Sequence, residues 1–475
     1  MKHSRSSIAL VSGFIAGIFG HASLAQVSGP DEADFRSLYK ELVEINTTRS
    51  SGSCTKAAEA MRAHLLAAGI PASDTQILAP PDRPNDGALI ATLSGRDRLA
   101  KPILLLAHID VVEATAADWQ RDPFKLVEEN GWFYARGASD DKAMAAVFTD
   151  SLVRYRKAGF KPRRTIKLAL TCGEETPNIF NSVSWLTQTQ PQVLSAAFAL
   201  NEGAGGELDK NGKAVALQIQ AGEKVYQDFT LEATDVGGHS SRPTKNNPIV
   251  RLSVGLARLG AYDFPIDINP VVRGYFEAET RLVAPDIAAD MRGILANPPD
   301  AAAVERLWAA NPGWNGAIRT TCVVTQISGG HAPNALPQRV QANVNCRILP
   351  RVPIDAVQRQ IVSVVNDSKI SVTPVGEAAI QAPLPPLSEA IMAPVRKVAN
   401  QIWPGVVIVP SMSTGATDGR FLNSTGVPTY GLSGMFHDAE GSHAHGLNER
   451  IRVQSLLDGR RFLYEVVKLY ANGTD

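Results

Sequence analysis

The sequence is poor in several features that would assign it to a particular class of protein. It contains 4 cysteines in 475 residues, too few and too scattered to predict a disulfide framework. Lysine plus arginine and aspartate plus glutamate each number 47, so no net charge favours binding to nucleic acid or to an anionic membrane. Neither Gly-x-Ser-x-Gly nor His-Glu-x-x-His occurs, which argues against a serine hydrolase with a nucleophile elbow and against that type of single-zinc protease.

The overall composition is that of a globular protein. Hydrophobic residues make up 44% of the chain and charged residues 20%, which argues against extended disorder. A chain of 475 residues is too long for one ordinary hydrophobic core, so we expect two domains.

The first residues predict an export signal. Lys2 and Arg5 precede an apolar run over residues 8–20, and small residues follow up to Ala25. This order is typical of a signal peptide, which we predict to span residues 1–25 with cleavage near Ala25. A membrane anchor is the alternative, but the run is too short to cross a bilayer. We therefore expect an exported protein, periplasmic or secreted, without a stable membrane anchor.

The four cysteines are far apart in the sequence. Cys322 and Cys346 lie in two strand-like segments and could pair if those strands are neighbours, which an oxidising compartment would allow. The sequence leaves this pairing open. Cys172 is expected to be a small buried hydrophobic side chain rather than a nucleophile.

Strands alternate with helices in the first half of the chain. Residues 102–112, 164–171 and 194–200 are apolar runs typical of buried strands. Residues 55–69 and 143–158 have helical periodicity. This alternation predicts an α/β fold with a mostly parallel sheet.

The pattern changes from about residue 223. Residues 225–234 and 340–348 alternate as strands with one exposed face would, as do residues 321–327, and residues 248–259 form an amphipathic helix. Residues 270–315 are rich in Ala, Pro and Asn and form an insertion of unpredicted shape.

A Pro-rich segment at residues 382–386 is typical of a hinge. Helix and strand patterns return after it. We predict a catalytic domain in two parts, residues 26–222 and 381–475. Between them lies an inserted α+β lid or dimerisation domain, residues 223–380.

Five short polar clusters follow apolar strands or stand near the C-terminus. Each alone has an ordinary explanation, such as a strand-end ion pair or a helix cap. Together they place histidines and carboxylates where parallel α/β sheets bind ligands, and such side chains suit zinc. The clusters are His108-Ile109-Asp110, Gly137-Ala138-Ser139-Asp140-Asp141-Lys142, Gly173-Glu174-Glu175, Asn201-Glu202-Gly203 and His443-Ala444-His445-Gly446-Leu447-Asn448-Glu449.

A compact metal site near the C-terminus is a rival interpretation of the last cluster. His437 and Asp438 lie close in sequence to His443 and His445. The loop would have to bend sharply to bring all four together.

In their order, the five clusters resemble the successive motifs of the zinc exopeptidases that include aminoacylase, bacterial glutamate carboxypeptidase, carnosinase and succinyl-diaminopimelate desuccinylase. The resemblance covers nearly the whole chain after the predicted signal. It implies two zinc ions bridged by Asp140. His108 and Glu202 would complete the site of one ion, and Glu175 and His445 that of the other.

The resemblance implies further roles close to the metal ligands. Asp110 would orient His108, and Glu174 would be the general base that takes a proton from the bridging water. The peptide bond after Asp140 is expected to be cis. Asn201 departs from the pattern, since many relatives have Asp there, but it lies outside the ligand set.

The inserted segment also resembles the lid of this family. His239 in Gly-Gly-His-Ser-Ser would stabilise the oxyanion, from the partner subunit in some members. Asn334 and Arg347 would bind substrate, and the guanidinium suits a terminal carboxylate. Gly415 and Arg420 belong to a loop that resembles a pocket lining.

The sequence therefore predicts a two-zinc metallohydrolase that cleaves a peptide or N-acyl amide bond next to a free carboxylate, of carboxypeptidase or dipeptidase type. An N-acyl amino acid deacylase with the same core is the alternative. A non-catalytic binding protein of the same fold is a third reading, although every ligand and Glu174 are present. Co²⁺ or Mn²⁺ could replace Zn²⁺. We expect small peptides or N-acyl amino acids as substrates, no nucleic acid, and a homodimer formed through the lid.

Overall fold

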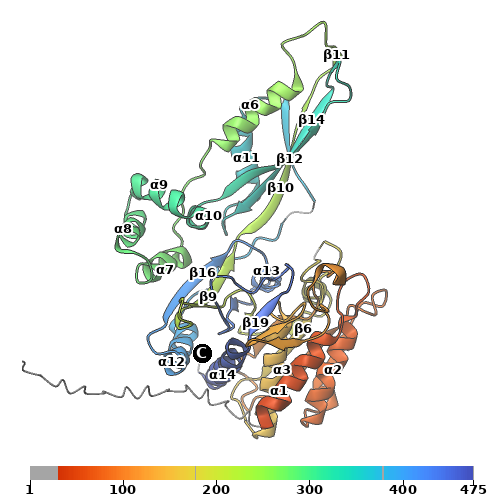
Figure 1. Ribbon diagram of the computed structural model, residues 1–475, viewed down its shortest axis with the longest axis vertical. Helices are drawn as coiled ribbons and strands as arrows, with labels where there is room; N and C mark the ends of the chain where they lie inside the picture. Colours follow the sequence, from red (N-terminus) through yellow and green to blue (C-terminus); the bar gives the residue numbers. More distant parts are fainter. Residues whose placement is uncertain (1–29, 177, 377–378, 474–475) are drawn as a thin grey trace, which may run out of the picture.

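A computed structural model describes residues 30–176, 178–376 and 379–473. It has a large sheet with its helices at one end and a smaller sheet at the other (Figure 1). The predicted signal peptide lies outside the described residues. Among the helices that are described, none combines the length and the apolar character needed to cross a membrane.

The large sheet has ten strands in the order β1-β2-β6-β3-β7-β17-β9-β8-β18, with β16 paired to β9. The strands are β1 (Thr75–Leu78), β2 (Ala88–Leu93), β3 (Ile103–His108), β6 (Ile166–Thr171), β7 (Phe198–Asn201), β8 (Gly206–Leu208), β9 (Ala214–Glu223), β16 (Val407–Ser413), β17 (Thr429–Gly431) and β18 (Phe436–His437). The central run β6-β3-β7-β17 is parallel throughout. The predicted α/β fold with a largely parallel sheet is confirmed.

Helices cover both faces of the large sheet. Successive side chains of a strand point to opposite faces, so alternate residues of one strand pack against different helices. On β3, Leu105 and Ala107 pack with the first group of helices, and Leu104 and Leu106 with the second. The first group is α1 (Pro30–Glu44), α2 (Cys54–Ala67), α3 (Lys142–Lys157), α12 (Glu389–Ile402) and α14 (Val453–Asn472), and the second is α4 (Ser182–Thr189), α5 (Pro191–Leu194) and α13 (Gly419–Ser424). Both faces of β3 are therefore buried.

The smaller sheet is antiparallel, with the order β12-β14-β10-β15. Its strands are β10 (Val225–Thr234), β12 (Thr321–Gly329), β14 (Arg339–Ile348) and β15 (Ile370–Pro374), and helices α6 (Pro248–Gly260) and α11 (Ile354–Val365) share its buried core. The chain passes from the large sheet into the small one at Lys224, between β9 and β10. The Lys224 ammonium is buried and donates hydrogen bonds to the carbonyls of Gly316 (2.7 Å) and Arg319 (2.8 Å).

The segment whose shape the sequence did not predict forms four short helices with a core of their own. They are α7 (Pro270–Glu279), α8 (Pro285–Ile294), α9 (Ala301–Ala310) and α10 (Pro312–Ile318), and α7 packs against β16 of the large sheet. Three of them begin at a polar cap: the side chains of Asn269, Asp300 and Asn311 accept hydrogen bonds from the first turn. The pairs Asn269-Pro270 and Asn311-Pro312 were therefore start signals for α7 and α10.

The chain has two disulfides, although its few and scattered cysteines did not predict a disulfide framework. Cys54 pairs with Cys172 and Cys322 with Cys346. Cys172 is buried, as expected, but it is bonded to a residue 118 positions away. Cys322 and Cys346 lie opposite each other on β12 and β14, so the pairing that the sequence left open is formed.

Candidate metal centre

The carboxyl ends of three neighbouring parallel strands meet at one edge of the large sheet. His108 is the last residue of β3, Glu174 and Glu175 follow the end of β6, and Glu202 follows β7. Strand β3 pairs in parallel with both β6 and β7. The register of the sheet therefore brings these side chains together, as open α/β sheets do for their ligands.

Two histidines and three carboxylates form a continuous cluster at this edge. The His108 Nε2 atom lies 3.1 Å from Asp140 Oδ1 and 3.5 Å from Glu202 Oε2. The His445 Nε2 atom lies 3.2 Å from Asp140 Oδ2 and 3.0 Å from Glu175 Oε2. Asp140 thus faces one histidine with each oxygen.

The donor set fits two divalent ions. The ligand atoms of His108, Asp140 and Glu202 lie within 4.8 Å of one another, and so do those of Asp140, Glu175 and His445. Each group offers one imidazole nitrogen and two carboxylates, which suits zinc, and Asp140 belongs to both groups. Hydrogen bonds to Asp140 and Glu175 raise the pKa of His445 to about 10, which reflects an excess of negative charge that cations would offset.

The rival metal site near the C-terminus is not formed. The Asp438 carboxylate accepts a hydrogen bond from Arg452 at 2.6 Å. His437, Asp438 and His443 belong to none of the metal-like clusters found in the described part of the chain.

Glu174 lies beside the ligands. It forms a further close group with His108 and Glu175. Burial and the negative charge of Glu202 raise the pKa of Glu174 to about 10. Like the shift of His445, this shift reflects crowded carboxylates whose charge cations would offset.

Asp110 has contacts that differ from those the sequence suggested. The His108 Nδ1 atom lies 3.1 Å from the main-chain carbonyl of Asp110 and 3.7 Å from its carboxylate. The Asp110 carboxylate instead accepts hydrogen bonds from the amides of Glu174 (3.3 Å) and Glu175 (3.1 Å). The carbonyl is therefore placed to orient the imidazole, and the carboxylate holds the loop that contains Glu174 and Glu175.

Glu449 is a site residue whose role was not predictable from the sequence. It is fully buried and accepts hydrogen bonds from the amides of Gly137 (3.0 Å), Ser139 (2.8 Å) and Asp140 (3.0 Å). It also pairs with Arg136 at 2.8 Å. The only signal for it in the sequence was its place four residues after His445.

The Glu449 contacts connect the turn of Asp140 to the loop of His445. Arg136, which pairs with Glu449, also donates to the carbonyl of Gly446. Just beyond, β19 (Arg450–Arg452) pairs with β5 (Trp132–Tyr134), whose other neighbour is β4 (Val127–Glu129). The peptide bond between Asp140 and Asp141 is cis, as the resemblance implied.

Asp418 is a second residue whose role in the site was not predictable from the sequence. Its buried carboxylate accepts hydrogen bonds from Thr171 (3.0 Å) and Asn181 (2.5 Å). Asn181 also donates to the carbonyl of Gly173. Asp418 thus fixes both ends of the loop that presents Glu174 and Glu175.

Of the predicted substrate-binding residues, Arg347 lies beside the loop that contains Gly415 and Arg420. Its Nη1 atom donates to the carbonyl of Thr414 at 3.0 Å, and its guanidinium stacks over the ring of Tyr226. Arg420 lies at the start of α13. Arg347 therefore contacts the start of the loop that contains the other two residues.

His239 and Asn334 lie elsewhere. His239 is in β11 (Gly238–His239), which pairs with β13 (Ala335–Leu336) directly after Asn334. Figure 1 shows β11 at the far tip of the smaller sheet, at the opposite end of the molecule from α14 and β19. Within one chain, these two exposed residues are thus remote from the metal cluster.

The chain belongs to the family described as Peptidase family M20/M25/M40, whose model matches residues 104–469. Human N-fatty-acyl-amino acid synthase/hydrolase PM20D1 is 30% identical over 391 residues, which are 79% of this chain and 76% of that protein. Aminoacylase-1A of Rattus norvegicus is 24% identical over 377 residues, which are 78% of this chain and 80% of that protein.

Solved structures share the fold at lower identity. The M20 family metallo-carboxypeptidase Sso-CP2 from Sulfolobus solfataricus has a TM-score of 0.62 at 19% identity, covering 94% of this chain and 100% of that one. Human carnosine dipeptidase 1 has a TM-score of 0.57 at 16% identity, covering 93% and 98%. The chain is thus a hydrolase of the family that its motifs resemble. Both peptide hydrolysis and N-acyl amino acid hydrolysis are consistent with its relatives.

Replacing Glu449 with alanine is expected to destabilise the protein by about 3–5 kcal/mol, because it leaves the buried Arg136 charge without its partner. It should also weaken metal binding, because the amides that hold Asp140 lose their acceptor. Chemical denaturation and metal titration measure the two effects. Glu440→Ala is the matched control, since Glu440 pairs with Arg450 at the surface and its loss should change little. Equal effects of the two substitutions would contradict the assigned role of Glu449.

Proposed function

We propose that this protein is an exported two-zinc hydrolase that cleaves a peptide or N-acyl amide bond next to a free carboxylate. The position of Asp140 is the observation that supports this most, because its two oxygens face the two halves of the ligand cluster. His108 and Glu202 would hold one zinc ion, and Glu175 and His445 the other. Co²⁺ and Mn²⁺ accept the same donors and would be substitutes.

Zinc at such a site polarises a carbonyl group and lowers the pKa of bound water. The residues of the chain supply the proton transfer. Glu174 adjoins the ligands and would take a proton on its carboxylate from the attacking water and pass it to the leaving amine. The hydrogen bonds from the Glu174 and Glu175 amides to Asp110 hold this loop in place.

Arg347 would bind the free carboxylate of the substrate. A guanidinium has five N–H donors, and one of them is used on Thr414. Stacking on Tyr226 fixes its plane, which favours a bidentate contact with a carboxylate. Gly415 and Arg420, in the adjoining loop, would line the same pocket.

Carboxypeptidase or dipeptidase activity is the first candidate, and hydrolysis of N-acyl amino acids is the second. The second is favoured by the 30% identity to a protein named N-fatty-acyl-amino acid synthase/hydrolase. Both reactions place a carboxylate beside the scissile amide, so the same catalytic residues serve either. A panel of dipeptides and N-acyl amino acids, short and long, distinguishes them by kcat/KM.

A homodimer would complete the site. His239 and Asn334 lie at the tip of the smaller sheet, remote from the metal cluster of their own chain, so a second copy would have to present them. Strand β12 is an edge strand with exposed apolar side chains, among them Val323 and Ile327. An exposed edge with apolar side chains is a ready surface for pairing with a second chain.

Glu174→Gln is expected to lower kcat by about 10²- to 10⁴-fold, because it removes the acid-base group. The zinc content should stay near that of the wild type, since Glu174 is not among the five proposed ligands. Plasma emission spectroscopy and turnover assays on the same samples measure both. Retention of full turnover by the variant would contradict the proposed mechanism.

Arg347→Ala is expected to raise KM about 10- to 100-fold for substrates with a free carboxylate, since a hydrogen-bonded ion pair is lost. Amidated substrates should be unaffected. Arg339→Ala is the matched control, because Arg339 lies at the other end of β14 and pairs with Glu232. A uniform effect on both substrate types would argue against carboxylate binding by Arg347.

Mixing two inactive variants tests whether the site is shared between copies. Glu174→Ala and His239→Ala are each expected to be inactive, while a heterodimer would hold one site with an intact Glu174 and an intact His239. After subunit exchange, we expect about a quarter of wild-type turnover, because half of randomly paired symmetric dimers are mixed and each has one intact site. No recovery in mixtures shown by mass spectrometry to contain the heterodimer would contradict the proposal.

A further inference from the structure

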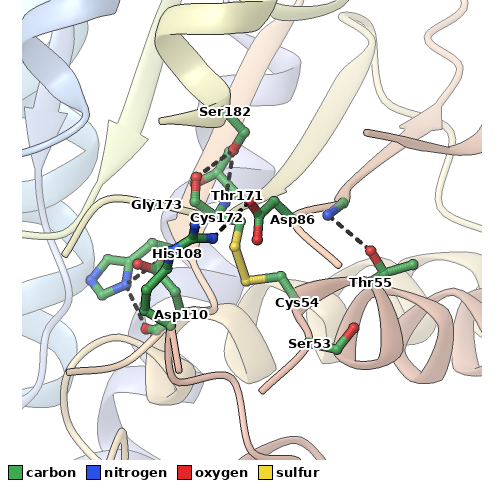
Figure 2. Close-up of a disulfide and its surroundings, with 12 residues drawn as sticks. Ser53, Cys54, Thr55, Asp86, His108, Asp110, Thr171, Cys172, Gly173 and Ser182 are labelled. Atoms are coloured by element: carbon green, nitrogen blue, oxygen red, sulfur yellow. Dashed lines mark hydrogen bonds and ion pairs between the residues drawn. A yellow bond between two sulfur atoms is a disulfide. The ribbon is translucent and has the colours of Figure 1, made fainter. Parts of the chain in front are cut away.

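The disulfide between Cys54 and Cys172 lies next to the proposed catalytic residues. Figure 2 shows the bond between Cys54 and Cys172, with Asp110 and Ser182 near it. Cys54 is the first residue of α2, and Cys172 follows β6, two residues before Glu174. Both cysteines are buried, with 2% and 5% of their surface exposed. The bond therefore joins a helix at the edge of the fold to the loop that presents Glu174 and Glu175.

The disulfide also lies close to the Asp110 carboxylate. One ligand-type atom each of Cys54, Cys172 and Asp110 lies within 4.8 Å of the other two. The Asp110 carboxylate accepts the amide hydrogen bonds of Glu174 and Glu175. A shift of the sulfur atoms would therefore reach both the carboxylate and the loop bonded to it.

The segment before Cys54 is hydrogen-bonded to Val111, the residue after Asp110. The amide of Val111 donates to the carbonyl of Thr47 at 3.4 Å, and Thr48 forms an isolated bridge with Val111. The amide of Ser53 donates to the carbonyl of Asn46. Three segments thus form a closed ring: residues 46–54, the Asp110–Val111 pair and the loop after β6, with the disulfide as its covalent link.

The backbone around Cys172 is held tightly. Its amide donates to Ser182 Oγ (2.7 Å), and the same hydroxyl donates to its carbonyl (2.9 Å). The next residue, Gly173, has φ +90°, and a Cβ there would lie 2.2 Å from the carbonyl oxygen of Phe180. Ser182 therefore holds the main chain of Cys172 while Cys54 holds its side chain, and little freedom remains one residue before Glu174.

We propose that the Cys54–Cys172 disulfide is a positioning element of the active site, and that its reduction lowers turnover of the folded enzyme. The proposal rests on the proposed roles of Glu174 and Glu175. A phosphine reductant would break the S–S bond by supplying two electrons. The two sulfurs take up two protons and become thiols, and the phosphine becomes its oxide with the oxygen of water.

A role in stability alone is the alternative, because a cross-link over 118 residues also restricts the unfolded chain. Melting temperature cannot distinguish the two roles, since both predict a decrease. The readouts that can are kcat, KM and zinc content at a temperature where every variant is folded. Misplacement of a catalytic group by about 1 Å costs turnover far more than it costs substrate binding.

The second disulfide provides a matched control within the same chain. Cys322 and Cys346 join β12 to β14 in the smaller sheet, and neither has a place in the proposed catalytic machinery. The double variant Cys322→Ser with Cys346→Ser is expected to keep the kcat of the wild type. In this variant the Cys54–Cys172 bond is the one remaining disulfide, so any effect of the phosphine can be assigned to it.

The experiment compares the full-length wild type, the Cys54→Ser/Cys172→Ser variant and the Cys322→Ser/Cys346→Ser variant, all loaded with zinc. We expect kcat of the Cys54/Cys172 variant to fall at least about tenfold with KM changed less than about twofold, and no such loss in the control. Phosphine treatment of the folded control variant should cause the same fall in proportion to the thiols labelled. Reoxidation should restore turnover.

Full turnover of the control variant with both Cys54 and Cys172 labelled as thiols, and circular dichroism unchanged, would overturn the proposal. This arm starts from folded, oxidised protein, so it decides the matter even if the Cys54/Cys172 variant does not fold. A lack of amide hydrolysis by the untreated, zinc-loaded wild type would be a different result. It would contradict the proposed function itself.

Discussion

The rest of the site depends on the position of Asp140 between two histidines. Its carboxylate is within 3.2 Å of both His108 and His445, and Glu175 and Glu202 complete the two groups. So many carboxylates at one sheet edge repel one another unless cations lie among them. The cluster is therefore costly for the bare protein and suited to an enzyme that binds two divalent ions.

The cluster is held by contacts that lie one layer behind it. Glu449 accepts three amide hydrogen bonds around Asp140, and Asp110 accepts those of Glu174 and Glu175. Asp418 fixes the ends of the same loop through Thr171 and Asn181. Buried carboxylates that accept main-chain amides fix backbone position directly, which is the kind of support that gives a metal site its geometry.

The metal cluster and the proposed carboxylate-binding residue belong to different sheets. The metal cluster lies at the edge of the large sheet, whereas Arg347 belongs to the smaller sheet and contacts the loop of Thr414. The two sheets meet at the buried Lys224, whose ammonium binds carbonyl groups at the end of the helical insertion. A relative movement of the sheets would therefore change the distance between Arg347 and the metal cluster, as lid closure changes the active sites of other enzymes.

Much of the fold was predictable because its signals are local. The apolar run over residues 102–112 predicted β3, which ends at His108, and the alternation over residues 225–234 predicted β10. The Cys54–Cys172 bond was not predictable, because it joins residues 118 positions apart and depends on how α2 packs against the sheet. The same holds for the Asp110 carboxylate: residue spacing placed it beside His108, but only the tertiary fold shows that it holds the Glu174 loop. The four helices over residues 270–318 were missed, although two of them, α7 and α10, begin at Asn-Pro pairs.

The most direct test of the account is a crystal structure of the zinc-loaded protein, with anomalous scattering measured on both sides of the zinc absorption edge. The account predicts two zinc peaks per chain on either side of the Asp140 carboxylate, one beside His108 and Glu202 and the other beside Glu175 and His445. A single peak, or peaks remote from Asp140, would contradict the assignment of Asp140 as the bridging ligand and with it the proposed two-metal mechanism.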